Sequence, residues 1–255
     1  MRAGSSSEPR ARRRWPQLSR ATTVPIAALV LVGGMTFVQV ADGPHPTITT
    51  APTERLLVAV TTPVVTRPPC HAVIHLGDSN LALAAGRFKT AYSAAGVNSV
   101  IDSGLGRGAN VVQGRGTTAL EAIAKYMVSI PSSGRCWVLE LSAADAMEAG
   151  KDHTDPGIPI RQMADALGDE PTLWITPVLT SAINDWNLAA STAYDKALLQ
   201  EAQHHPNITV LDWQDIALEH LDQFFSDGVH YSDALADILI QTVVQKLPEI
   251  WDLHP

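Results

Sequence analysis

Two short polar motifs lie towards opposite ends of this 255-residue chain and together could carry out nucleophilic catalysis. The first, Gly77-Asp78-Ser79-Asn80, follows the apolar run Ala72–Leu76. A buried strand that ends in a glycine turn and leads into a helix places the Ser79 hydroxyl at the carboxyl end of a parallel strand, where open α/β sheets build their sites. A glycine turn followed by helix capping explains the same residues without any chemistry.

The second motif, Ser226-Asp227-Gly228-Val229-His230, precedes the last amphipathic segment, residues 232–251. An aspartate three residues before a histidine can supply a general base and the group that orients it, provided that the loop folds back over Ser79. An Asp-Gly turn with Ser232 as a helix cap is the structural alternative. The presence of both motifs, each at a junction between a strand and a helix, favours catalysis.

The elements that must position these motifs alternate along the chain from Cys70 onward. Strands are expected at 72–76, 99–101, 136–141, 172–178 and 208–212, and helices at 81–95, 117–129, 159–167, 185–203 and 232–247. Alternation of this kind predicts a parallel sheet with helices on both faces. We therefore expect a three-layer α/β/α domain with a five-stranded parallel sheet.

With these motifs the chain resembles the SGNH (GDSL-like) hydrolase superfamily, whose first block is Gly-Asp-Ser and whose last is Asp-x-x-His. The resemblance covers roughly residues 70–250 and extends to extracytoplasmic actinobacterial domains and to those attached to membrane acyltransferases of envelope polysaccharides. The residues that carry this closer likeness are Ile101-Asp102, Gly106-Arg107, Trp174–Pro177, Asn187, and Leu211-Asp212-Trp213 ahead of Asp227–His230.

The resemblance implies a flavodoxin-like SGNH fold with Ser79 as nucleophile, His230 as base and Asp227 as the residue that orients His230. It also implies that the amides of Ser79 and Gly106 form the oxyanion hole. Arg107 is expected to be either an exposed surface charge or a residue that binds substrate.

One family block is not matched. Where the family has Gly-x-Asn after its third strand, this chain has Leu141-Ser142-Ala143-Ala144-Asp145, so Ala144 stands at the position of the asparagine donor. Ser142 and Asn110 are the nearest polar candidates for a replacement contact with substrate. The mismatch keeps a second interpretation open, a non-catalytic module that binds envelope glycan or a partner acyltransferase.

The amino-terminal region predicts a membrane anchor. Residues 1–20 contain six arginines and one glutamate, and residues 21–41 contain no charge. Twenty-one residues at 1.5 Å each can cross a hydrocarbon core of about 30 Å, and the flanking charges predict a cytoplasmic amino terminus. A cleaved signal peptide and a twin-arginine signal are the alternatives. Residues 42–69, rich in Pro and Thr, read as a linker to a domain at 70–255 outside the cytoplasm.

The net charge of the chain indicates which classes of binding partner to expect. The whole chain carries a net charge of −8; residues 1–41 contribute +5, and residues 42–255, with 12 basic against 25 acidic residues, carry −13. So acidic a domain is not expected to bind nucleic acid or polyanionic glycans. A small acyl ester or an envelope glycan or lipid fits better.

The chain contains two cysteines and none of the common metal or cofactor motifs. Cys70 and Cys136 enter segments expected to neighbour each other, which could bring them into bridging range; two buried thiols are the alternative. No Cys/His cluster has zinc spacing, and no phosphate-binding glycine motif occurs, so neither metal nor cofactor is expected. The sequence as a whole predicts a serine esterase or acyl-transfer enzyme acting on short acyl esters.

Overall fold

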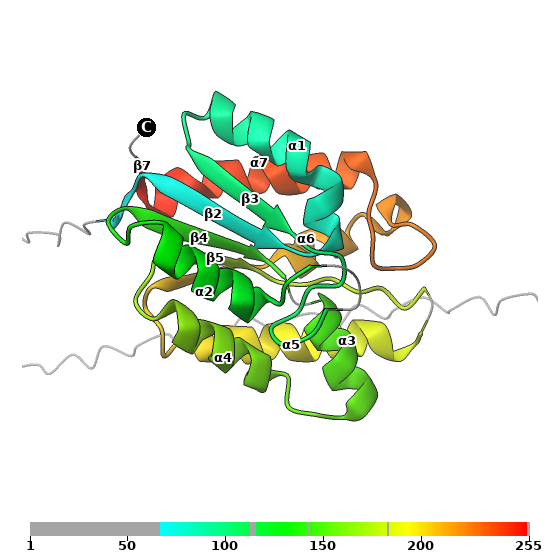
Figure 1. Cartoon of the computed structure of the whole chain (residues 1–255). Helices are drawn as coiled ribbons and strands as arrows, with labels where there is room; N and C mark the ends of the chain where they lie inside the picture. Colours follow the sequence, from blue (N-terminus) through cyan, green and yellow to red (C-terminus); the bar gives the residue numbers. More distant parts are fainter. Residues whose placement is uncertain (1–66, 113–115, 142, 183, 254–255) are drawn as a thin grey trace, which may run out of the picture. The chain divides into compact units, whose positions relative to one another are not determined.

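Five parallel strands form the central sheet of the computed structural model, in the order β3-β2-β4-β5-β6 (Figure 1). The structure describes residues 67–112, 116–141, 143–182 and 184–253. The strands are β2 (Ala72–Gly77), β3 (Ser99–Ser103), β4 (Arg135–Glu140), β5 (Thr172–Ile175) and β6 (Ile208–Leu211). Residue 73 pairs with residue 99 on one side and with residue 136 on the other, so β2 lies inside the sheet.

Alternation of side chains along the strands creates two apolar cores. Val73 and Val138 face a core shared with α1 (Ser79–Ala94), α6 (Trp213–Leu218) and α7 (Asp233–Ile250). Ile74 and Leu139 face the opposite core, shared with α2 (Ala119–Ser129), α3 (Ala143–Asp152), α4 (Gly157–Leu167) and α5 (Trp186–Ala202). Figure 1 shows α1 and α7 on one face of the sheet and α2, α4 and α5 on the other. The expected three-layer α/β/α architecture is confirmed.

All five expected strands and all five expected helices are present, with ends that move by a few residues. The fourth strand is shorter than expected: β5 ends at Ile175, where the sequence predicted a strand as far as residue 178. Helices α3 and α6 were not expected. The missed α3 is built largely from alanine and charged residues, so it offers few large apolar side chains from which a helical period could be recognised.

The two ends of the described domain meet beside α7. Pro69–Cys70 (β1) pairs in parallel with Asp252–Leu253 (β7), and Arg67 donates a hydrogen bond to the Pro248 carbonyl at 2.8 Å. The last residues of the expected linker therefore belong to the folded domain. The rest of the linker and the expected segments 1–20 and 21–41 lie outside the described residues; within residues 67–253, as far as described, no helix is both long and apolar enough to cross a membrane.

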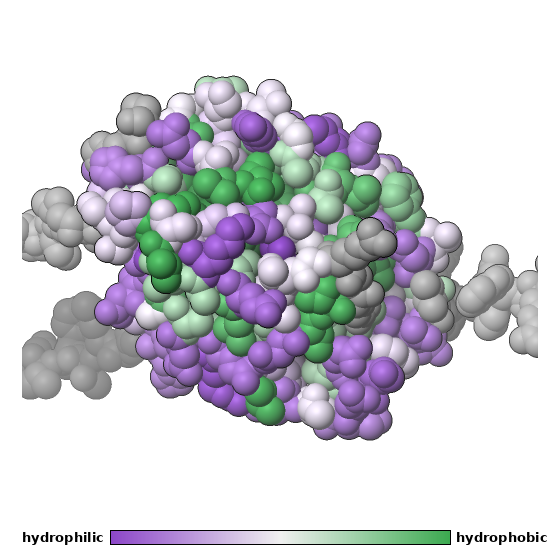
Figure 2. Space-filling view, viewed as in Figure 1, coloured by the Kyte–Doolittle hydropathy of each residue, from purple (hydrophilic) through white to green (hydrophobic). Residues whose placement is uncertain are grey.

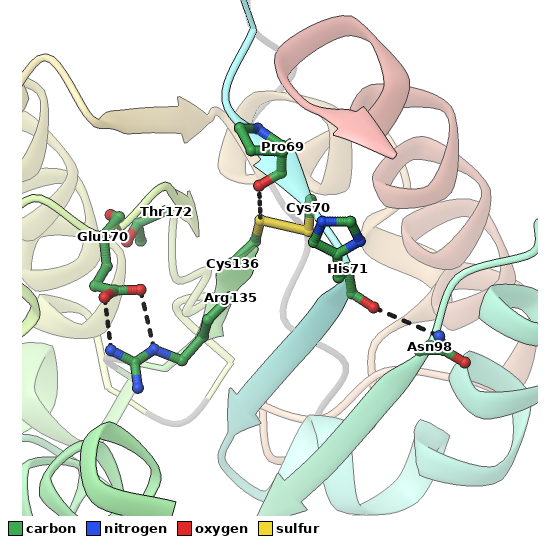
Figure 3. Close-up of a disulfide and its surroundings, with 8 residues drawn as sticks. All are labelled: Pro69, Cys70, His71, Asn98, Arg135, Cys136, Glu170 and Thr172. Atoms are coloured by element: carbon green, nitrogen blue, oxygen red, sulfur yellow. Dashed lines mark hydrogen bonds and ion pairs between the residues drawn. A yellow bond between two sulfur atoms is a disulfide. The ribbon is translucent and has the colours of Figure 1, made fainter. Parts of the chain in front are cut away.

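A disulfide joins Cys70 in β1 to Cys136 in β4, with Cα atoms 5.8 Å apart (Figure 3). Both cysteines are buried, and the Pro69 carbonyl lies against Cys136 Sγ. Beside it, Arg135 forms a paired hydrogen bond with Glu170 at 2.6 and 2.9 Å. The disulfide thus fixes the start of the domain to the middle of the sheet, at the end opposite to the Ser79 turn.

Reducing this disulfide should lower the melting temperature of the full chain by roughly 4–16 °C. Cross-linking residues 66 positions apart restricts the unfolded chain and contributes about 2–4 kcal/mol, and each kcal/mol corresponds to about 2–4 °C in a domain of this size. Calorimetry with and without reductant measures the shift, and a Cys70→Ser, Cys136→Ser double variant should not respond to reductant. Two alkylatable thiols in unreduced protein from its native compartment would contradict the link.

Candidate active site

The Ser79 turn is built at the carboxyl end of β2. Asp78 caps α1 by accepting a hydrogen bond from the Asn80 amide at 3.0 Å, and Ser79 is the first helical residue. A Cβ atom at Gly77 would collide with the side chain of Leu81, so only glycine allows the chain to enter the helix this closely. The turn leaves Ser79 partly exposed at a helix amino terminus, where the helix dipole favours negative charge.

The loop before α7 brings His230 to this serine. His230 Nε2 lies 2.7 Å from Ser79 Oγ, and His230 Nδ1 lies 2.8 Å from Asp227 Oδ2. With the Nδ1 proton directed at the carboxylate, Nε2 is free to accept the hydrogen bond that the Ser79 hydroxyl donates. The three residues named from the sequence are therefore within hydrogen-bonding distance in the order that nucleophilic catalysis requires.

Asp227 also holds its own loop in shape. Its Oδ1 accepts hydrogen bonds from the amides of Val229 and His230, each at 2.9 Å. Partial burial by itself would raise the pKa of Asp227, but the hydrogen bonds from the His230 amide and ring and from the Val229 amide outweigh it and lower the pKa below its ordinary value. Asp227 is therefore ionised at neutral pH and orients the imidazole as a carboxylate.

Gly228 and Asn80 fix the position of the loop. Gly228 has φ +68°, and a Cβ atom there would collide with Thr180, whose amide donates to the Gly228 carbonyl at 2.8 Å. Asn80, buried beside the nucleophile, donates from Nδ2 to the Val229 carbonyl at 3.1 Å. Asn80 thus links α1 directly to the histidine loop. Sequence reasoning assigned it no role, although its position next to Ser79 was a signal.

A pocket of about 390 Å³ opens at Ser79 and His230. Its other lining residues are Asp78, Leu105, Gly106, Ala143, Ala144, Met147 and Val229. Gly106, at φ +60°, lies in the turn after β3, and Ala144 lies at the start of α3 with 1% of its surface exposed. The structure thus brings Gly106 and Ala144 to the same pocket as Ser79 and His230.

Arg107 does not reach this pocket. Its guanidinium is 2% exposed and donates hydrogen bonds to Asp102 Oδ1 at 2.8 Å, to the Asp102 carbonyl at 2.9 Å and to the Thr117 carbonyl at 3.0 Å. Neither a surface charge nor a substrate clamp describes it. The side chain turns inward because Asp102, at the end of β3, pairs with it beneath the loop that carries Gly106.

Asn110 and Ser142 are the two polar residues expected from the sequence to contact the substrate near residues 141–145. The Asn110 amide donates to Gln162 Oε1 on α4 and is absent from the pocket lining, so it is directed away from Ser79. Ser142 lies outside the described residues. None of the described residues that line the pocket carries a side-chain amide.

Asp145 connects the wall of the pocket to the Gly106 loop. Both of its carboxylate oxygens lie 3.0 Å from the Ala109 amide nitrogen, across 36 residues of sequence. Burial raises the pKa of Asp145 to about 6, and the Ala109 amide opposes part of this rise. The bond fixes the loop after β3 to the first turn of α3, and so fixes Gly106 relative to Ala144.

A buried polar group lies beneath the nucleophile turn. His75 receives the Tyr92 hydroxyl on Nδ1 at 3.1 Å and faces Glu140 from Nε2 at 3.3 Å, while Tyr231, next to His230, donates to Glu140 at 2.9 Å. Burial also raises the pKa of Asp78 to about 7. These contacts join β2, β4 and the histidine loop under the site.

No cluster of three or more potential metal ligands occurs among residues of the described ranges.

Comparison with known proteins identifies the fold. No family model matches the chain, and no curated protein matches its sequence. Among solved structures, an acetylxylan esterase from Geobacillus stearothermophilus shares 15% identity at a TM-score of 0.53, over 71% of this chain and 95% of that one. A member of the lipolytic G-D-S-L family from Veillonella parvula shares 14% identity at a TM-score of 0.55, over 69% and 98%.

These likenesses cover nearly the whole of both neighbours. Together with the sheet order, they show that residues from about 67 onward have the fold of GDSL-type esterases. At such low identity they show the fold alone, since one fold hosts many functions.

Proposed function

We propose that this protein is a serine esterase or acyl-transfer enzyme that acts on short acyl esters. The observation that carries the proposal is the continuous hydrogen-bonded series from Asp227 through His230 to Ser79, open to a pocket. A helix cap alone explains Ser79 and Asp78, but it does not explain why a histidine oriented by a carboxylate meets that serine from 151 residues away.

In the proposed reaction, His230 Nε2 takes the proton of the Ser79 hydroxyl as Oγ attacks the ester carbonyl carbon. The tetrahedral oxyanion is held by the amides of Ser79 and Gly106, which are fixed before the reaction begins. His230 then gives its proton to the leaving alcohol oxygen, and an acyl-enzyme remains on Ser79. Water, or an acceptor hydroxyl, attacks the acyl carbon and releases the serine.

Envelope carbohydrate or lipid is the proposed source of the ester. The acidic charge of residues 42–255 argues against polyanionic partners, and the acetylxylan esterase among the structural neighbours acts, by its name, on an acetylated glycan. A membrane acyltransferase is a proposed partner, from the sequence resemblance alone.

Replacing Ser79 by Ala should abolish labelling by a fluorophosphonate serine probe and lower kcat/KM for an acetyl ester at least about a thousandfold. His230→Ala should cost about as much, because members of a triad act as a unit. The exposed Ser93, replaced by Ala on the same helix, is the matched control and should label normally. Unchanged turnover in Ser79→Ala would show that the chemistry lies elsewhere.

Replacing Ala144 by Asn should raise kcat for an acetyl ester at least about tenfold with little change in KM. Ala144 lines the pocket with Ser79 and Gly106, so an asparagine there adds a donor that bonds mainly in the transition state, an interaction worth about 10² to 10³ in comparable holes. Steady-state kinetics give both constants. Ala143→Asn places the same amide one position away and should give no such gain.

The result for Ala144 also separates the two functions. A brisk wild-type enzyme with no gain in Ala144→Asn would mean that another donor completes the oxyanion hole. Failure of both forms to turn over ester or to bind the serine probe would favour the second candidate, a module that binds glycan or a partner acyltransferase in the same pocket. The absence of the asparagine donor is the observation that motivates this candidate.

We also propose that residues 21–41 anchor the protein in the cell membrane and that the domain lies outside the cytoplasm. The arginine-rich start and the uncharged 21-residue span support this topology. A reporter that fluoresces only in the cytoplasm, fused after Pro255, should be silent. A bright signal would overturn the topology.

A further inference from the structure

The pocket at Ser79 is more apolar than an acetyl group requires. Five of its nine lining residues are apolar: Leu105, Ala143, Ala144, Met147 and Val229. Figure 2 shows apolar side chains near α3 among several apolar patches on this face of the molecule. At about 390 Å³ the pocket falls within the range of ordinary ligand sites, about 300–1,000 Å³, and an acetyl group would fill only a small part of it.

Four of the five apolar residues come from two segments, the turn after β3 and helix α3. Leu105 precedes the proposed oxyanion residue Gly106, and Ala143, Ala144 and Met147 come from α3. The leaving alcohol oxygen must lie at His230, which protonates it, and the oxyanion must lie at Gly106 and Ser79. The acyl chain, the remaining substituent of the carbonyl carbon, then occupies the part of the pocket that neither of these groups fills, which Leu105 and Met147 line.

The charges of the described pocket residues favour a neutral acyl group over an anionic one. No lysine or arginine is among the described residues that line it, and its only carboxyl, Asp78, is 5% exposed and serves as the α1 cap. A succinyl-type acyl group would bring a second carboxylate to a site without a cation.

We propose that this pocket binds a neutral, unbranched acyl chain longer than acetyl, of about four to six carbons, with Leu105 and Met147 setting the length. The proposal rests on the proposed esterase function and specifies its acyl group. Met147 is half-buried against the core, whereas Leu105 is 55% exposed and stands at the rim. Leu105 can therefore be changed without disturbing the fold.

The test is the acyl-length profile of the full-length chain on p-nitrophenyl acetate, butanoate, hexanoate and decanoate. The leaving group is constant through the series, so the ratio of kcat/KM values reports on the acyl pocket alone. We expect hexanoate to exceed acetate by about tenfold or more, since each fully buried methylene is worth up to about fourfold. Decanoate should fall below hexanoate.

Two variants and a control locate the effect. Leu105→Ala should lower the hexanoate to acetate ratio about three- to tenfold, and Met147→Trp should fill the pocket and shift the optimum to acetate. Leu83→Ala removes a comparably exposed leucine, 61% exposed, that lies outside the pocket, and should leave the ratio unchanged.

The outcomes separate the two proposals. Turnover that is fastest on acetate and falls with chain length would overturn the acyl-chain proposal and leave the esterase function standing. Equal ratios in Leu105→Ala and Leu83→Ala would overturn the role of Leu105 even if Met147→Trp failed to fold. No turnover of any ester, with no labelling by the serine probe, would overturn the esterase function and the acyl-chain proposal with it.

Discussion

The hydrogen bond between His230 Nε2 and the Ser79 hydroxyl joins two segments 151 residues apart, and the rest of the site is arranged to make it possible. Ser79 is held by the close passage of Gly77 against Leu81, and His230 is held by the three hydrogen bonds that Asp227 accepts. The Asn80 amide then ties the two segments together directly. A displacement of either segment by about 1 Å would break a contact of 2.7 Å, so the geometry depends on rigid support from both sides.

That support includes buried acids that would be costly elsewhere. The pKa of Asp78 rises to about 7 and that of Asp145 to about 6, in both cases chiefly because burial disfavours the charged form. A backbone hydrogen bond offsets part of this cost for each carboxyl. Asp78 accepts one from the first turn of α1, and Asp145 accepts one from the loop that carries Gly106. The buried ion pair between Arg107 and Asp102 stabilises the same loop. Asp78, Asp145 and the Arg107–Asp102 pair therefore hold backbone segments in place around the candidate triad.

On the proposed function, alanine at position 144, where the family that the sequence resembles has asparagine, has two physical consequences. It removes a side-chain donor from the proposed oxyanion hole, which predicts slow turnover of simple esters, and it adds apolar surface to the pocket. An apolar wall binds the ground state and the transition state alike, whereas a donor acts mainly in the transition state. On the proposed function, this site exchanges part of its catalytic rate for affinity towards a longer acyl chain.

The sequence by itself determined the layered fold and the residues of the candidate triad. Strand and helix periodicities are local signals, and Gly77–Ser79 and Asp227–His230 each carry their turn chemistry within a few residues. Only the tertiary structure decided the rest. That Arg107 turns inward, that Asn80 reaches the Val229 carbonyl, and that α3 forms the apolar wall all depend on contacts between segments distant in sequence, to which neither propensity nor spacing is sensitive.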